Sequence, residues 1–305
     1  MAKKFDIIVV GAGPSGITAA IYALREGLKV LLIDKEGIGG KLNIIPSIQN
    51  YPGYKDVSGI QLATNMIEQL TELKATIVLS SIISISKKNT DFTLKTESEA
   101  FVSKAVILAT GTRDKKLGVP GEQKFLGRGV SYCSLCDGHF FRNKPVVVIG
   151  GGDRAYSEAY HLTSLCSHVY LIQRRAEARA DKSNIKKLQD CSNATIIKEA
   201  NIVSIIGDTR VRSVVYKVGS SEYTLEISGV FPLVGSLPNT ELVNRFTVLD
   251  ANNYVKVDSN YQTEIDGLFA CGDVVSKTIR QIATSVGDGA IAATMASRYV
   301  KGFIK

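Results

Sequence analysis

The chain has 305 residues, of which 45% are hydrophobic, and a formal net charge of +8. This length suffices for two ordinary domains, each with its own core. The lysines and arginines are scattered, with no basic block interleaved with aromatic side chains, so we expect no nucleic-acid partner. The positive charge is better suited to speeding the encounter with an acidic protein partner.

We expect neither a signal peptide nor a membrane span. Lys3 and Lys4 precede an apolar run, but Asp6 interrupts this run, which continues into a glycine-rich loop instead of a cleavage site. No other stretch approaches the length of a membrane span. The five cysteines are odd in number and show no framework spacing, which favours a reducing, cytoplasmic setting.

The first predicted unit is a strand, a glycine-rich loop, a helix and a second strand. Residues 5–10 form a short apolar strand that runs into the loop Gly11-Ala12-Gly13-Pro14-Ser15-Gly16. A helix is predicted over residues 14–26, and a second strand over residues 29–33 ends at Asp34. A glycine loop in this context predicts a dinucleotide site.

The same pattern begins again near the middle of the chain. A strand over residues 145–149 leads into Gly150-Gly151-Gly152-Asp153-Arg154-Ala155, followed by a helix over about 154–164 and a strand over 169–172. This internal repeat predicts a second dinucleotide site.

Each unit then adds a β-rich segment. Residues 75–104 alternate as short strands before the strand 105–108 enters Ala109-Thr110-Gly111, and residues 202–227 and 229–234 repeat this arrangement. We therefore expect an α/β fold with two Rossmann-like dinucleotide-binding domains of three-layer type, each with an inserted antiparallel β-meander.

The two exits from these units, near Arg113 and near residues 236–238, are the natural domain boundaries. We expect a discontinuous first domain of residues 1–113 and 242–305 and a second domain of residues 114–241. The return of the tail to the first domain is inferred from Gly272-Asp273, which follow a short apolar strand.

The second strands of the two units end in different side chains at the same distance from their loops. An acidic residue such as Asp34 can bond an unmodified adenosine ribose, whereas arginines accommodate a 2′-phosphate. Gln173-Arg174-Arg175, with Arg179 beyond, ends the second strand. The first site is thus predicted to take FAD or NAD and the second NADP, unless the arginines are only an exposed cationic face.

Cys133 and Cys136 lie between the two predicted nucleotide loops. Two cysteines at this spacing can interconvert between dithiol and disulfide. Half a zinc site is the main alternative, but the chain has no second cysteine pair and its histidines lack ligand spacing, so no metal is expected. Asp137 is either a proton donor or acceptor for the exchanging thiol or an ordinary turn residue.

Together these motifs resemble the low-molecular-weight thioredoxin reductases over nearly the whole chain. Besides the first loop, the resemblance rests on Gly39-Gly40, Asn50-Tyr51-Pro52-Gly53, Ala109-Thr110-Gly111, the segments 132–138 and 267–273, and Arg280-Gln281-Ile282-Ala283. It implies FAD contacts at Gly11, Gly13, Pro14, Ser15, Gly16, Asp34, Lys35, Gly40, Leu42, Asn50, Ala109, Thr110, Gly111, Gly272, Asp273, Arg280, Gln281 and Ile282. It implies NADPH contacts at Gly150, Gly152, Asp153, Arg154, Ala155, Arg174, Arg175 and Arg179.

The resemblance also implies an electron relay. NADPH would pass hydride to FAD, the reduced flavin would reduce a Cys133-Cys136 disulfide, and the dithiol would reduce the disulfide of thioredoxin or a thioredoxin-like protein. Cys136 would face the flavin, and Asp137 would handle the proton of the exchange. A homodimer is implied, as is a rotation of the nucleotide domain about connections near Arg113 and Ser236.

Two positions depart from the family's pattern. Gln173 stands where histidine is usual, and Arg154 stands where the loop normally has a small residue. Arg154 either crowds the pyrophosphate or pairs with a phosphate oxygen. Other functions stay open: the same chemistry fed by NADH or ferredoxin, service to a peroxiredoxin or glutaredoxin-like partner, or a non-catalytic redox sensor.

Overall fold

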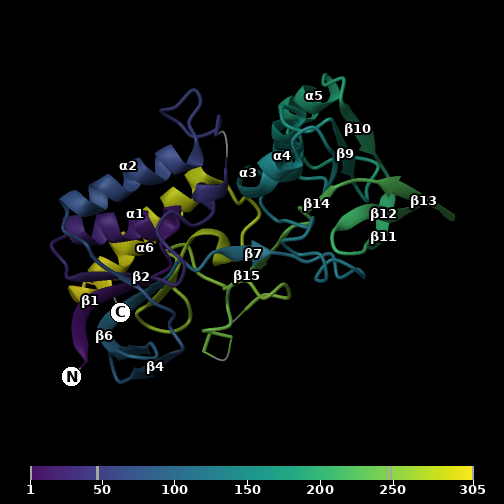
Figure 1. Cartoon of the computed structure of the whole chain (residues 1–305). Coiled ribbons are helices and arrows are strands. Elements are labelled where there is room, and N and C mark those ends of the chain that lie inside the picture. The colour runs from purple at the N-terminus through teal and green to yellow at the C-terminus, as the bar shows by residue number, and fades with distance from the viewer. Residues whose placement is uncertain (1, 46–47, 245, 248, 304–305) are drawn as a thin grey trace. The chain divides into compact units, whose positions relative to one another are not determined.

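The computed structural model describes residues 2–45, 48–244, 246–247 and 249–303, apart from the side chains of Leu135 and Cys136. The chain divides into two compact units (Figure 1). Unit 1 comprises Met1–Arg113 and Leu237–Lys305, and unit 2 comprises Asp114–Ser236.

The second boundary lies earlier than the expected one at residue 241. The Asn239 side chain donates to the Thr110 carbonyl at 2.9 Å, and the Thr110 hydroxyl donates to the Asn239 carbonyl at 2.7 Å. Arg113 forms an ion pair with Glu241 at 2.5 Å. These long-range contacts hold residues 237–241 to unit 1, and spacing in the sequence carries no signal for them.

A parallel sheet forms the centre of unit 1. Its order is β3-β2-β1-β6. On the other edge of β6, the last three residues pair in parallel with β16, and the first four pair antiparallel with β5. The parallel strands are β1 (Lys3–Val10), β2 (Val30–Asp34), β3 (Thr76–Leu79), β6 (Ala100–Leu108) and β16 (Leu268–Ala270). The meander adds β4 (Ser84–Lys88) and β5 (Asp91–Lys95).

The strand β1 is apolar along most of its length because it is covered on both faces. Ile7 and Val9 face a core shared with the helices, whereas Ile8 and Val10 face a second core under the meander. The helices α1 (Pro14–Arg25), α2 (Gly59–Glu72) and α6 (Ile282–Val300) lie on the first face (Figure 1). Unit 1 therefore has the three layers that the sequence predicted.

Unit 2 repeats this plan with a smaller parallel sheet of order β10-β9-β8-β14 and a separate antiparallel meander of order β11-β12-β13. Val146 and Val148 pack against helix α4, and Val147 and Ile149 pack towards the meander. The strands are β8 (Pro145–Ile149), β9 (His168–Ile172), β10 (Ala194–Ile197), β11 (Ala200–Gly207), β12 (Val211–Val218), β13 (Ser221–Glu226) and β14 (Gly229–Pro232). The helices are α3 (Ser134–Asp137), η2 (Gly138–Phe141), α4 (Asp153–Thr163) and α5 (Lys182–Gln189).

Four short elements complete the fold. The connecting strands β7 (Thr112–Asp114) and β15 (Ser236–Pro238) pair with each other where the chain passes between units. The 3₁₀ helices η1 (Gly40–Ile44) and η3 (Gly272–Val274) belong to unit 1. Within the described ranges, no helix combines the length and apolar character needed to cross a bilayer.

The helices α1 and α6 pack with their backbones in close approach. A Cβ atom on Gly289 would lie 2.2 Å from the carbonyl oxygen of Ser15, far inside van der Waals contact. Gly287, on the exposed side of α6, would place a Cβ atom with no neighbour within 4 Å. The same helix therefore contains one glycine that the packing requires and one that it does not.

We expect Gly289→Ala to lower the free energy of unfolding by about 1–3 kcal/mol, because one helix must shift to admit the methyl group. Gly287→Ala should raise it by about 0.5–1 kcal/mol, because alanine is the better residue in an open helical position. Urea unfolding of both variants measures the difference. Effects of the same sign would contradict the packing described for these helices.

Candidate nucleotide and redox sites

The first glycine loop is held against the sheet by two backbone approaches. Gly11 has φ +106°, and its Cβ atom would lie 2.2 Å from the Ala109 carbonyl oxygen. A Cβ atom on Gly16 would lie 1.8 Å from the Gly11 carbonyl oxygen. These glycines thus bring the start of α1 down onto the ends of β1 and β6.

Gly13 has no comparable structural requirement. Its φ is −76°, which any residue adopts, and a Cβ atom there would meet no atom within 4 Å. Gly13 is the N-cap of α1, and no side chain caps this helix. Backbone N–H groups at such a helix start are suited to an anion such as a pyrophosphate. A dinucleotide that passes close to the backbone accounts for glycine here.

Asp34 lies beside this loop at the end of β2. One carboxylate oxygen accepts the Ala12 N–H at 2.7 Å, and the other accepts the N–H groups of Glu36 at 2.8 Å and Gly37 at 3.0 Å. The carboxylate is therefore fixed next to the glycine loop. The ammonium of Lys35 pairs instead with Glu36 at 2.9 Å on the exposed surface.

Residues predicted from the end of the chain also reach the first loop. Gly272, with φ +77°, would place a Cβ atom 2.3 Å from the Ser15 hydroxyl. Asp273 accepts a hydrogen bond from the Ser285 hydroxyl at 3.3 Å. The guanidinium of Arg280 lies over the Tyr254 ring, 3.9 Å from its centroid, and donates to the carbonyl of Asp273 at 3.3 Å. Arg280 thus secures the turn that carries Asp273.

A second group of predicted residues comes together near the start of α6. The Asn50 amide donates to the Gln281 side-chain oxygen at 3.2 Å, although the two residues are far apart in sequence. Gln281 caps α6, which begins at Ile282. A Cβ atom on Gly40 would lie 3.1 Å from the Cα atom of Gly13. Of the remaining predicted positions, Leu42 is buried in the core, and Thr110 and Gly111 form the exit from β6.

A buried polar cluster that the sequence analysis did not identify supports the Gly272 turn. Asp288 accepts the Gly272 N–H at 3.1 Å and pairs with Lys277 at 2.5 Å. It also accepts a hydrogen bond from the Tyr261 hydroxyl. Burial and the Asp288 carboxylate raise the pKa of Tyr261. All these partners come from separate loops and α6, so spacing in the sequence carries no signal for the cluster.

The second glycine loop has the same design as the first. A Cβ atom on Gly150 would lie 2.3 Å from the Leu233 carbonyl oxygen and 2.8 Å from the Ala155 methyl group. Gly152 is the N-cap of α4, with φ −103°, no side-chain cap and no atom within 4 Å of a Cβ atom. The Asp153 carboxylate accepts the N–H of Asp181 at 2.6 Å. The loop therefore offers a second uncapped helix start.

Gln173 shapes the segment that carries the arginines. It is 2% exposed, accepts a hydrogen bond from Tyr156 at 2.8 Å and donates to the Arg175 carbonyl at 2.7 Å. The Arg179 N–H donates to the Gly151 carbonyl at 2.7 Å. The side chains of Arg174, Arg175 and Arg179 are exposed, and none has a hydrogen bond or ion pair among the described residues. Gln173 is thus a structural residue, and the arginines are available to a ligand.

Cys133 immediately precedes α3 and is disulfide-bonded. The side chain of Cys136, the other predicted redox residue, lies outside the described part of the chain. Cys166, Cys191 and Cys271 are free thiols. Burial raises the pKa of Cys166 to about 11 and that of Cys271 to about 12, so neither is a thiolate at neutral pH. Disulfide chemistry is thus concentrated at Cys133.

Asp137, the third predicted catalytic residue, ends α3 and is partly buried. Its N–H donates to the Cys133 carbonyl at 3.1 Å. The Ser134 hydroxyl is buried without a hydrogen-bond partner among the described residues. Those residues also contain no group of three or more histidine, cysteine, aspartate or glutamate side chains placed to hold a metal ion.

Arg154 forms a set of intramolecular contacts that the sequence did not predict. Its guanidinium donates to Glu158 at 2.6 Å, to the Tyr132 carbonyl at 2.7 Å and to Asp114. The side chain is thus engaged with unit 2 itself. Contact between Arg154 and a nucleotide stays a prediction.

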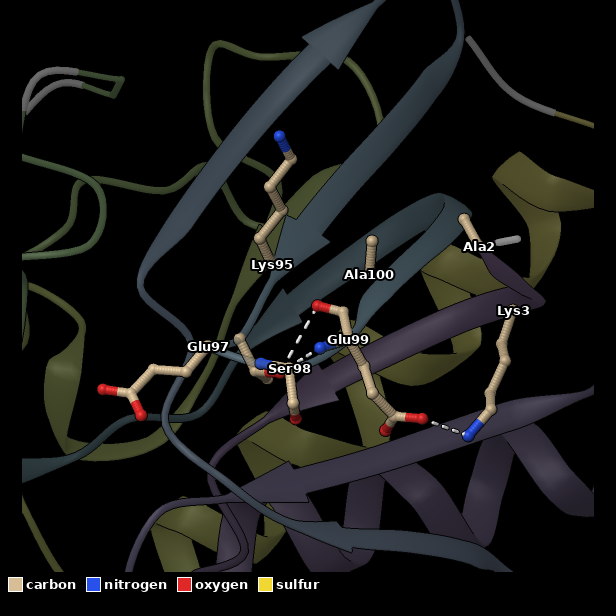
Figure 2. A pocket seen from close by; sticks show the side chains of 8 residues that line it. Ala2, Lys3, Lys95, Glu97, Ser98, Glu99 and Ala100 are labelled. Carbon is tan, nitrogen blue, oxygen red and sulfur yellow. Dashed lines mark hydrogen bonds and ion pairs between the residues drawn. The ribbon is translucent and has the colours of Figure 1, made fainter.

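Unit 1 has a surface hollow lined by residues other than those of its glycine loop. It has a volume of about 440 Å³ and lies at the turn between β5 and β6, beside the start of β1. Figure 2 shows its charged rim, including the ion pair between Lys3 and Glu99 at 2.5 Å. Exposed pairs of this kind contribute little energy. None of the residues that line it belongs to a glycine loop or to the segment around Cys133.

The chain is similar to known proteins in sequence and in fold. Residues 5–289 match the family described as pyridine nucleotide-disulphide oxidoreductase. Thioredoxin reductase of Treponema pallidum is 39% identical, covering 98% of each chain. The structure of Lactococcus lactis thioredoxin reductase matches with a TM-score of 0.96 at 37% identity, covering 98% of this chain and 99% of that one. The structure of a ferredoxin-flavin thioredoxin reductase of Clostridium acetobutylicum matches with a TM-score of 0.55 at 32% identity, covering 99% of this chain and 100% of that one.

We expect Gly13→Ala to lower dinucleotide binding in unit 1 by about tenfold while leaving the unfolding of the apoprotein nearly unchanged. The added methyl group has room within the protein, but it occupies the approach to the α1 N-terminus. Gly16→Ala is the matched control and should unfold the apoprotein more easily, since its methyl group meets the Gly11 carbonyl. Flavin absorbance after purification and apoprotein melting measure the two effects. Equal flavin content in wild type and Gly13→Ala would contradict the site.

Proposed function

Because the chain belongs to the pyridine nucleotide-disulphide oxidoreductase family, we propose that it is a thioredoxin-disulfide reductase that uses NADPH, FAD and a Cys133-Cys136 disulfide. The family membership and the related reductases make the chain a flavin-dependent disulfide oxidoreductase with a pyridine nucleotide as partner in electron transfer. The observation that carries the proposal is a disulfide-bonded Cys133 in the unit that also contains the second glycine loop.

The residues of unit 1 fit FAD. Gly13 leaves the α1 N-terminus open for the pyrophosphate, and Asp34 lies where it can meet the adenosine ribose. Asp273 offers a carboxylate to the ribityl hydroxyls, and the start of α6 at Gln281 favours negative charge. When bound, FAD exchanges electrons with both a nicotinamide and a disulfide.

The residues of unit 2 fit NADPH. The N–H groups at the start of α4 are suited to a pyrophosphate, and Arg174, Arg175 and Arg179 are suited to a 2′-phosphate. Their guanidinium groups are exposed, so binding would not have to break an existing ion pair among described residues. This supports NADPH over NADH as the donor.

The dithiol would pass two electrons to the partner by thiol–disulfide exchange. One thiolate of the Cys133/Cys136 pair attacks a sulfur of the partner's disulfide, forming a mixed disulfide and releasing one partner thiolate. The other thiol loses its proton, attacks the mixed disulfide and releases the second partner thiolate. The chain's disulfide is restored, and both partner cysteines are reduced. Asp137 is proposed to exchange the proton, with Cys136 as the thiol that faces the flavin.

We propose thioredoxin or a thioredoxin-like protein as the partner, from the names of the related reductases and the net charge of +8, which suits an acidic protein. A homodimer and a reducing, cytoplasmic setting are proposed with it, the latter because three cysteines are free thiols. The second candidate is the same dithiol chemistry with ferredoxin as donor, which the Clostridium acetobutylicum relative's name favours.

An anaerobic titration of the flavin with NADPH, NADH and then dithionite tests the donor. We expect NADPH to bleach the flavin at a much lower concentration than NADH. Replacing Arg174 or Arg175 with glutamine should lower the affinity for NADPH by about tenfold, because each variant loses a charge-assisted bond to the 2′-phosphate. The affinity for NADH should stay nearly the same. Bleaching by dithionite alone would reject NADPH and support another donor.

A further inference from the structure

Arg154 lies at the start of α4, directly after the glycine loop of unit 2. Its Nε atom donates to Glu158, one helical turn away, at 2.6 Å. One terminal nitrogen donates to Asp114, and the other donates to the Tyr132 carbonyl at 2.7 Å. Three of the directions in which a guanidinium can donate are therefore directed at groups of unit 2.

Arg154 and Glu158 together bond to the peptide groups on either side of Cys133. Arg154 itself holds the carbonyl of the preceding residue, Tyr132. Glu158, oriented by Arg154, accepts the N–H of the following residue, Ser134, at 3.2 Å. The peptide groups on both sides of the redox cysteine are thus bonded to one ion pair on α4.

The rest of this loop is also secured. The Tyr132 hydroxyl donates to Glu122 at 2.5 Å, and Glu122 accepts two backbone N–H groups at 2.8 Å. The Ser131 hydroxyl accepts the Cys133 N–H at 3.1 Å. Arg154 and Glu158 complete this set of bonds from the side of α4.

The charges of the cluster make Arg154 hard to replace. The Glu158 side chain is 5% exposed, and Asp114 and Arg154 are 23% and 33% exposed. Burial alone lowers the pKa of Arg154, but together the carboxylates of Glu158 and Asp114 raise it by a larger amount. The net shift of the pKa is therefore upward, and the guanidinium stays charged. Loss of its charge would leave two carboxylates without their cation beside the Cys133 loop.

We propose that Arg154 is a positioning residue that holds the Cys133 loop ready to form its disulfide, through Tyr132 directly and through Glu158 at Ser134. The inference rests on the proposed function only in that the Cys133 pair is redox-active. A loop held in this way keeps the two thiols near each other in the dithiol state, which favours ring closure to the disulfide. Loss of the bonds should therefore shift the equilibrium, disulfide + 2 GSH ⇌ dithiol + GSSG, towards the dithiol.

Hydrogen exchange and redox equilibration of the purified holoenzyme test this role. In Arg154→Met we expect amides of the 131–137 peptide to exchange about tenfold faster, as expected for local loss of charge-assisted bonds. In glutathione buffers, acid-quenched alkylation and mass spectrometry of that peptide should show an equilibrium shifted about tenfold towards dithiol. Arg154→Lys, which keeps the charge but lacks the planar fork, should recover part of both effects.

Arg212→Met is the matched control. Arg212 belongs to the same unit and forms an exposed ion pair with Asp208. Its removal should change neither the hydrogen exchange of the 131–137 peptide nor the redox equilibrium. If Arg154→Met fails to fold, the same hydrogen-exchange and redox measurements are made on Arg154→Lys and on Arg154→Met/Glu158→Gln. The double variant removes both charges of the pair but keeps an acceptor for the Ser134 N–H.

Two outcomes would overturn the proposal. The 131–137 peptide and the redox equilibrium could be unchanged in a folded variant, or all peptides of unit 2 could exchange faster by one common factor, which indicates a global stability effect. In the first case, an accompanying fall in NADPH affinity would identify Arg154 as a phosphate ligand instead. Neither measurement uses thioredoxin, so failure of the enzyme to reduce thioredoxin would reject the proposed function separately.

Discussion

The close approach of backbone to backbone at the glycine loops is the constraint on which both nucleotide sites depend. Gly16 lies against the Gly11 carbonyl and Gly289 against the Ser15 carbonyl, so α1 packs on the strand ends and on α6 without intervening side chains. In the same region Asp34 accepts the Ala12 N–H, and Gly272 lies against Ser15. Unit 2 uses the same device, with Gly150 against the Leu233 carbonyl.

The buried charges of unit 1 follow from this close packing. A turn with φ +77° at Gly272 exposes a backbone N–H in a region with little water, and Asp288 accepts it. Lys277 and Tyr261 supply the other bonds of that carboxylate. A buried ion pair is costly unless its polar atoms are bonded, and here both oxygens of the Asp288 carboxylate accept hydrogen bonds. The cluster therefore stabilises one particular geometry of the turn that carries Asp273.

The sequence predicted the elements whose signals are local. The strand predicted at 145–149 has the bounds of β8, and the helix predicted over residues 14–26 ends one residue beyond α1. Helix α2 was not predicted, although Ser58 accepts the Gln61 N–H as an N-cap and marks its start. Helix α5 also went unassigned. It is short and mostly polar, with Leu188 as its only buried residue, so its periodic apolar signal is weak.

Long-range partners explain what the sequence left open at the sites. From its position in the glycine-loop motif, Arg154 is predicted to contact a nucleotide. Its observed partners Asp114 and Tyr132 lie far from it in the sequence, so the motif carries no signal for them. The spacing of Arg154 and Glu158 is compatible with a helical ion pair, but it does not say which backbone groups the pair reaches.

One helix of unit 2 therefore serves two purposes. The N–H groups at the start of α4 have no side-chain cap and are suited to the proposed nucleotide, while side chains from its first two turns bind the peptide groups around Cys133. A change in the position of α4 would move both sets of groups together, because they share one rigid element. A small residue at position 154 would leave that connection to Glu158 alone. Arginine at this position therefore adds a direct hydrogen bond from the segment after the glycine loop to the Tyr132 carbonyl beside Cys133.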